Sequence, residues 1–187
     1  MILRTATATS SILGVALLAA CGSMSPMMPM QPMYSQASLP AAVQVPAGNK
    51  VAMETVGVGE ITYQCNPKKD MADQFEWVFV GPDAKLNDRG GKQIGKYYGP
   101  PATWENMDGS KLTATQVAVA PGASGSIPMQ LVKANPAMGS GAMNGVTYIQ
   151  RVSTQGGVAP SMPCAAGNVG AKQTVKYQAD YIFYKAM

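Results

Sequence analysis

The chain has 187 residues, with 14 lysine and arginine residues against 10 aspartate and glutamate residues, and it contains no histidine. The absence of histidine excludes Ser-His-Asp and Cys-His nucleophile pairs and all imidazole metal ligands. Since 47% of the residues are apolar and only 13% are charged, the composition is typical of a folded globular protein.

The first twenty residues have the layout of a secretory signal peptide. Arg4 precedes an apolar run that is too short to cross a bilayer as a helix. The run ends in the sequence LAACG at residues 18–22, which resembles a bacterial lipobox. We predict that residues 1–20 are removed and that Cys21 receives acyl chains, which anchor the exported protein to the cell envelope, at the outer membrane facing the periplasm. The alternative is an ordinary signal peptide that leaves Cys21 as a free thiol.

Residues 21–45 form a segment rich in methionine and proline, without charge and without a hydrophobic period. Proline disfavours both helix and sheet, so we predict a lipidated, flexible tether in front of the folded domain. The first half of this segment is crowded with methionine: Met24, Met27, Met28, Met30 and Met33. Thioethers are ligands for Cu(I), so the cluster indicates either a copper-binding tether or a biased linker in which methionine is a neutral filler.

Residues 46–187 have the length of one domain, and their apolar residues recur with a period of two. The segments with strand character are 50–55, 58–65, 75–80, 93–98, 111–120, 127–134, 145–152 and 174–184. Turn residues separate most of them, for example Gly81-Pro82-Asp83. We therefore predict an all-β fold, a single antiparallel β-sandwich or barrel-like domain of about eight strands with little helix.

Two cysteines lie within this domain, Cys65 and Cys164. In an exported protein the default for such a pair is a disulfide, here closing a loop of about 100 residues. The alternatives are a redox-active pair and two thiolate metal ligands. Redox pairs usually lie close in sequence, and two thiolates alone make a poor zinc site, so a structural disulfide is favoured.

The charges of the domain give no sign of a nucleic-acid partner. Removal of residues 1–20 takes away only Arg4, so 13 basic residues remain against 10 acidic ones, a net charge of +3. The basic residues are scattered, and nothing resembles a basic helix or an aromatic RNA-binding motif. The expected partners are the membrane, through the lipid anchor, and an unknown small ligand or envelope protein.

Several segments, taken in order, are similar to those of one secreted family. They include TYQC at residues 62–65, WVFVGPDAKL at 77–86, DGSK at 108–111, VTYIQRV at 146–152 and YQADYIFY at 177–184. In this combination the chain resembles the secreted Domain of Unknown Function 3455 family of bacteria and fungi, over nearly all of residues 46–184. The resemblance implies one exported, mostly β domain with a paired cysteine, and it transfers no catalytic residue. The chain departs from the family at Met129 and Gln130, where the family is richer in large apolar residues.

The candidate ligand-binding residues are Trp104, Tyr97, Tyr98 and Asp108, which lie close together in the sequence. An aromatic face beside a carboxylate is a common way to hold a sugar ring. The alternative is that Trp104 belongs to the core and that Asp108 starts a hairpin turn.

The candidate carboxylates for a catalytic pair are four: Glu60, Glu105, Asp108 and Asp180. A two-carboxylate glycosidase needs no histidine, but sequence spacing does not show that any two of these carboxylates lie at the separation that the reaction requires. Asp180 also has Arg151 as a possible partner, either in a buried ion pair or with both facing water on opposite edges. We do not expect an enzyme.

The first functional hypothesis is thus a non-enzymatic, membrane-anchored lipoprotein whose all-β domain binds a ligand or an envelope partner. Cu(I) handling by the methionine-rich tether is the second hypothesis. Glycan binding, or activity on glycans, is the third. Apart from Cu(I) in the second hypothesis, no cofactor is expected.

Overall fold

A computed structural model of the protein describes residues 34–187. In this part of the chain there are two short 3-10 helices, η1 (Ala41–Val43) and η2 (Ala166–Asn168), and no helix that is long and apolar enough to cross a membrane. The strands are β1 (Asn49–Lys68), β2 (Met71–Asn87), β3 (Gln93–Tyr98), β4 (Thr103–Asn106), β5 (Lys111–Ala120), β6 (Met129–Ala134), β7 (Val146–Gly156) and β8 (Lys172–Ala186).

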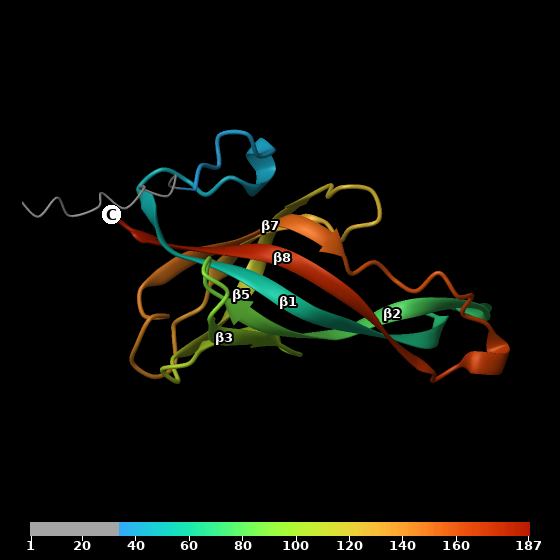
Figure 1. Ribbon diagram of the computed structural model, residues 1–187. Helices are drawn as coiled ribbons and strands as arrows, with labels where there is room; N and C mark the ends of the chain where they lie inside the picture. The colour runs from blue at the N-terminus through green and yellow to red at the C-terminus, as the bar shows by residue number, and fades with distance from the viewer. Residues whose placement is uncertain (1–33) are drawn as a thin grey trace, which may run out of the picture. The chain divides into compact units, whose positions relative to one another are not determined.

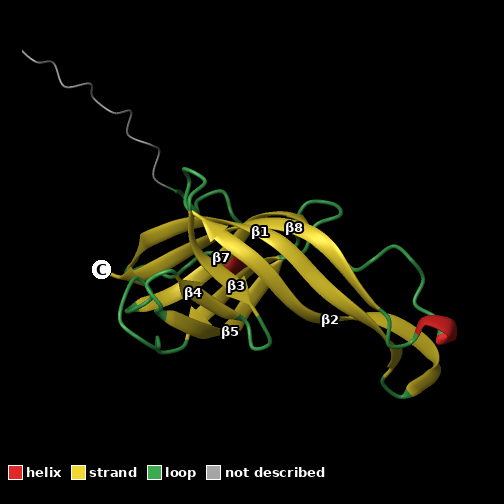
Figure 2. Ribbon diagram, turned by 60° about the horizontal axis from the view of Figure 1, so that its bottom comes forward, coloured by secondary structure: helices red, strands yellow, loops and turns green. Residues whose placement is uncertain are grey.

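The eight strands form an antiparallel meander that closes into a barrel (Figures 1 and 2). Each strand pairs with the next along the chain, and β8 returns to pair with β1. Within the barrel, closure removes the open sheet edges that a flat sheet would expose. The prediction of an all-β antiparallel domain is confirmed, and of the two architectures it left open the chain adopts the barrel.

The strand boundaries differ from the predicted ones where glycine and proline interrupt the pattern. The predicted segments 50–55 and 58–65 are one strand, β1, which passes through Gly57 without a break. The sequence Gly81-Pro82-Asp83, predicted as a turn, lies inside β2. Pro82 fits there because β3 begins to pair with β2 only at Asp83, so β3 does not need the N–H that proline lacks. The short strand β4 was not predicted.

Inward-pointing side chains fill the barrel. The rings of Tyr97 and Trp104 stack with their centroids 4.6 Å apart, and the ring of Tyr181 packs against Tyr97 at 5.0 Å. Around these rings lie the other members of the core: Ile61, Tyr63, Ala84, Leu86, Leu112, Ile127, Val132, Met143, Val146, Ile149, Tyr177, Ala179 and Phe183. The centre of the barrel is therefore a packed hydrophobic core.

Residues 34–45 pack against the outer face of the barrel. Val43 and Val45 are 0% and 4% exposed, and they join a second apolar cluster with residues of β5 to β8. The buried amide of Gln150 on β7 donates to the backbone oxygen of Val43 (2.6 Å) and to the side-chain oxygen of Gln36 (2.9 Å). We predicted that the tether would extend to residue 45, and the structure differs for its last twelve residues, because apolar side chains and a buried amide fix them to the barrel. Residues 21–33 of the predicted tether lie outside the described part.

Parts of β1, β2 and β8 extend beyond one end of the barrel as a long arm (Figure 2). We define the arm as residues 60–68 of β1, 71–82 of β2 and 172–176 of β8. In this region β1 pairs with both of the other strands, whereas β3 pairs only with residues 83–87 of β2, and β7 stops at the pair Gly156–Tyr177. The arm therefore begins where the neighbouring strands of the barrel end.

Candidate functional site

The outer edge of the arm is formed by β2. Within residues 34–187, the segment 71–82 of β2 pairs with β1 on one side only. The other side is an open strand edge, of the kind that soluble proteins usually cover or shorten.

The register of the arm identifies which backbone groups face this open edge. The N–H of Cys65 on β1 donates to the oxygen of Ala171, and the oxygen of Cys65 accepts from the N–H of Gly170, so both groups point away from β2. Its partner Trp77 is therefore in a non-hydrogen-bonded pair, and the N–H and C=O of Trp77 point away from β1. The orientation of the backbone groups repeats every two residues along a strand, so the N–H and C=O groups of Phe75 and Phe79 also point away from β1. Phe75 is paired with Pro67, which has no N–H to donate.

The same three residues form a row of aromatic side chains. Phe75, Trp77 and Phe79 lie two residues apart on one strand, so their side chains project from one face of the sheet. This face continues the inner face of the barrel, since Phe79 contacts Tyr63 edge to face, with ring centroids 6.1 Å apart. Phe79 is 53% exposed, and Trp77 is half-buried. The arm thus carries exposed aromatic surface outside the packed core.

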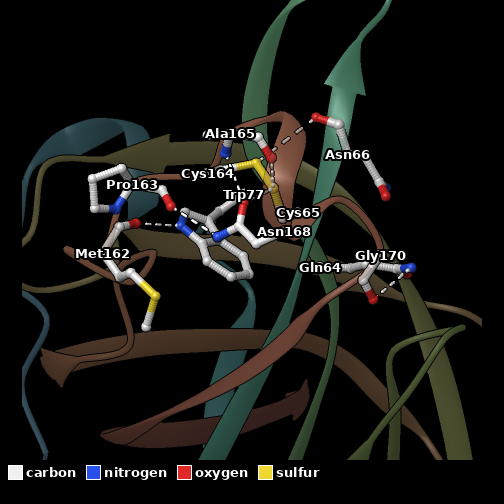
Figure 3. The surroundings of a disulfide bond; sticks show 10 residues. All are labelled: Gln64, Cys65, Asn66, Trp77, Met162, Pro163, Cys164, Ala165, Asn168 and Gly170. Atoms are coloured by element: carbon white, nitrogen blue, oxygen red, sulfur yellow. Dashed lines mark hydrogen bonds between the residues drawn. A yellow bond between two sulfur atoms is a disulfide. The ribbon is translucent and has the colours of Figure 1, made fainter.

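A disulfide joins the loop before β8 to this arm (Figure 3). Cys65 and Cys164 are bonded, with their Cα atoms 5.4 Å apart. The predicted disulfide is confirmed. The indole N–H of Trp77 donates to the backbone oxygen of Met162 at 2.7 Å, and the side chain of Asn168 bridges the loop by bonding to the N–H of Ala165. The covalent bond and these hydrogen bonds hold the loop beside the aromatic row.

The four residues predicted to bind a ligand do not form one exposed face. Tyr97 and Trp104 are 5% and 2% exposed and point into the barrel, where burial raises the pKa of the Tyr97 hydroxyl. Tyr98 lies on the outer face, and its hydroxyl donates to Glu105 at 2.7 Å. Asp108 lies in the turn between β4 and β5. Because the buried indole of Trp104 offers no surface for stacking, a glycan site at these residues loses its aromatic platform.

Asp108 has a structural role in its turn. One carboxylate oxygen accepts hydrogen bonds from the hydroxyl (2.6 Å) and the N–H (2.8 Å) of Ser110, and the other accepts from the N–H of Ala142 (2.7 Å). These hydrogen bonds lower the pKa of Asp108, and the bond from the Ser110 hydroxyl contributes most. The carboxylate joins the β4–β5 turn to the loop before β7.

The other acidic residues considered for catalysis are also separate. Asp180 forms an ion pair with Arg89 at 2.9 Å, and Arg89 also pairs with Glu54. Arg151 instead donates to the backbone oxygen of Pro128, so the suggested ion pair between Arg151 and Asp180 does not form.

Glu105 pairs with a lysine and a tyrosine on the outer face. It accepts from the Tyr98 hydroxyl and forms an ion pair with Lys96 at 3.3 Å. The hydrogen bond from Tyr98, followed by the contact with Lys96, lowers the pKa of Glu105.

Glu60 faces solvent on β1 and lines a shallow surface groove of about 560 Å³ with Lys176 and Gln178.

The remaining predicted site residues lie outside the described part of the chain. These are the lipidation candidate Cys21 and the copper-ligand candidates Met24, Met27, Met28, Met30 and Met33. Within residues 34–187, no group of three or more acidic or cysteine side chains is arranged to hold a metal ion.

Sequence reasoning missed the arm as a site. The alternation of Phe75, Trp77 and Phe79 was visible as strand character, but a strand pattern does not reveal whether its edge is paired. The mismatch in length that marks the arm, 20 and 17 residues for β1 and β2 against 6 and 4 for β3 and β4, is seen only in the structure, since the segments predicted from the sequence are shorter.

The comparisons with known proteins give one match. The sequence model of the family described as "Protein of unknown function (DUF3455)" matches residues 46–185, which include nearly all of the barrel and the whole arm. A search of curated proteins and a search of solved structures each found no match. The family match confirms the resemblance seen in the sequence, and the chain belongs to the DUF3455 family.

Proposed function

We propose that this protein is a lipid-anchored, non-enzymatic binding protein of the bacterial cell envelope, and that its arm is the surface that receives a partner. The observation that carries this proposal is the aromatic row on an open strand edge, with Phe79 53% exposed. Aromatic rings bury a large area at a low cost in side-chain entropy, which is why they are enriched at binding sites. The disulfide beside them supports a rigid, preorganised surface.

The filled barrel favours this external site over an internal one. Barrels that hold small ligands leave space at their centre, whereas here Tyr97, Trp104 and Tyr181 occupy it. The ring of Tyr181 also lies against the backbone of Gly57, which leaves no gap on that side. A partner that binds at the surface requires no rearrangement of this core.

Attachment to the membrane is proposed from the sequence and from the disulfide. A disulfide is compatible with an exported protein, because such bonds persist in oxidising compartments. The lipobox-like segment at residues 18–22 supports acylation of Cys21. Mass spectrometry of the mature protein tests this: we expect a lipid-modified N-terminal peptide that begins at Cys21, and an unmodified peptide contradicts the anchor.

Site-specific cross-linking in the producing cell tests the binding surface. We expect a photoreactive amino acid at position 79 to give a discrete covalent adduct, and the adduct to be lost when Trp77→Ala is added. The control position is Val117 on β5, which is as exposed as Phe79, at 54% against 53%, but lies away from the arm. Equal labelling at both positions contradicts a specific site on the arm.

Copper handling by the methionine cluster is a second candidate function, supported by five thioethers within ten residues of a predicted tether. A peptide of residues 22–36 is titrated with Cu(I) and compared with a peptide in which the five methionines are leucines. Affinity for Cu(I) no better than that of free methionine contradicts this function.

A further inference from the structure

We propose that the partner binds to the arm as an added β-strand, hydrogen-bonded to the open edge of β2, and that this strand is basic. The inference rests on the proposed function, since it assigns a binding mode and a chemical class to the partner of the same surface. Strand addition is a common way for a sheet edge to recognise an extended peptide.

The geometry of the edge supplies the hydrogen-bonding groups. Phe75, Trp77 and Phe79 each direct one N–H and one C=O away from β1, as the register with Cys65 requires. No hydrogen bond within residues 34–187 uses any of these six groups. They alternate along the edge at the spacing that an antiparallel or parallel strand needs. An extended peptide is the occupant whose own groups match this pattern.

The charges along the edge select a basic partner. Between residues 70 and 82 there are three acidic residues, Asp70, Asp73 and Glu76, and no lysine or arginine, although the whole chain has a net charge of +4. The lysines of the arm lie on its other strands, β1 and β8. All three acidic residues are exposed, and none forms an ion pair within the described residues. A strand that carries lysine or arginine would place opposite charges beside them, and such pairs across a sheet are stabilising.

The same charges disfavour a second copy of this chain as the added strand. If two copies of β2 paired antiparallel about Trp77, Glu76 of one copy would lie diagonally across from Glu76 of the other. Like charges that face each other across a sheet destabilise the pairing. The open edge is therefore matched to a basic peptide better than to itself.

The affinities of synthetic peptides that differ in charge test the inference on the purified domain, residues 34–187. The probe is an eight-residue peptide of alternating valine and lysine, with both ends blocked. Its matched controls are the valine–glutamate peptide and a valine–lysine peptide with N-methyl groups on alternate amides. We expect the lysine peptide to bind at least about tenfold more tightly than either control, because one control reverses the charge and the other removes the backbone donors.

Two variants of Phe79 separate backbone pairing from contact with the ring. Phe79→Pro removes the N–H that faces the open edge, without removing a hydrogen bond to β1, whereas Phe79→Ala removes only the ring. Strand addition predicts that Phe79→Pro binds the lysine peptide at least about tenfold more weakly than Phe79→Ala does. Melting curves of both variants show whether the fold is retained, and the N-methylated peptide applies the same test without any variant.

Each outcome supports or overturns a defined part of the inference. Equal binding of the lysine and glutamate peptides overturns the basic partner, and equal binding by the two variants overturns strand addition. If no peptide binds while the adduct at position 79 still forms in cells, strand addition by a basic segment fails and the proposed function stands. If both the peptide and the adduct are absent, the proposed function fails as well.

Discussion

Gly57 shows how one missing side chain allows the barrel to close. A Cβ atom at this position would lie 2.6 Å from Cε2 of Tyr181, closer than van der Waals contact allows. Tyr181 is 1% exposed and packed in the centre of the core, so its ring cannot move away without cost. The glycine is therefore required by packing in a strand whose backbone conformation any residue can adopt.

The first prediction follows from this contact. We expect Gly57→Ala to lower the free energy of unfolding by about 1–3 kcal/mol, the usual cost of overpacking a core. Gly167→Ala is the control, because a Cβ there meets no atom within 4 Å. Urea unfolding measures both, and equal stability of the two variants contradicts the packing argument.

Asp108 gives a prediction for the dependence of stability on pH. Its pKa is lowered in the folded protein by the Ser110 hydroxyl and by the N–H groups of Ala142 and Ser110. A lowered pKa contributes stability that is complete above the ordinary aspartate pKa, about 3.9, and is lost as the pH falls through the folded value. We expect the wild type to have a higher melting temperature than Asp108→Asn at pH 7, and the difference to shrink between about pH 5 and pH 2. A difference that stays constant over this range contradicts the role given to the carboxylate.

At the scale of elements, hydrophobic periodicity predicted most strands because each has one face in the core and one in solvent. Strands β3 and β5 begin and end where the pattern placed them, at residues 93–98 and 111–120. The pattern failed for β4, since a four-residue strand behind Pro100-Pro101 is too short to show a period. It also failed at Pro82, because a proline predicts the end of a strand. Only the structure shows that no neighbouring strand needs a hydrogen bond from position 82.

The disulfide is the second element whose contribution is testable. It links the loop before β8 to β1 across 99 residues of sequence. In the chain-entropy model a loop of this length contributes at most about 4 to 5 kcal/mol. We expect the double variant Cys65→Ser, Cys164→Ser to melt at a lower temperature and to lose order in the loop while the barrel still forms, because the core of the barrel lies elsewhere. Thermal melting and circular dichroism measure this, and an unchanged melting temperature contradicts the structural role.

At the scale of the whole molecule, the domain is larger than the composition suggested. The segment 34–45 reads as a continuation of the methionine and proline tether, since it carries no charge and no period. Val43 and Val45 alone do not predict a docking site, because the apolar outer face that receives them comes from four strands distant in sequence. The closed barrel was one of two predicted architectures, and closure depends on pairing between β1 and β8, at opposite ends of the domain.

Deleting this segment tests its contribution. Burial of a valine is worth about 1.5–3 kcal/mol, and part of this is offset by the entropy of ordering the chain. We expect a domain that begins at Pro46 to have a free energy of unfolding roughly 2 kcal/mol lower than one that begins at Tyr34, and to bind an apolar dye at the uncovered face. Equal stability and equal dye binding contradict the packing of residues 34–45.

The arm could not be predicted as a candidate site from the sequence, because the proposed binding depends on the unpaired side of β2 rather than on a motif within it. Phe75, Trp77 and Phe79 have the spacing of any strand with one buried face. Only the register shows that their backbone groups point to an open edge and that the row continues beyond the barrel. The aromatic residues that the sequence favoured, Tyr97 and Trp104, are core residues of the same barrel.

Residue-resolved amide hydrogen exchange along β2 in the free domain measures whether the arm presents an open edge. The N–H groups of Glu76 and Val78 face β1 and are hydrogen-bonded to it, whereas those of Trp77 and Phe79 face the open side. We expect the amides of Trp77 and Phe79 to exchange at least about tenfold faster than those of Glu76 and Val78, in strict alternation. Equal protection at all four positions would mean that the edge is already covered and would contradict strand addition at β2.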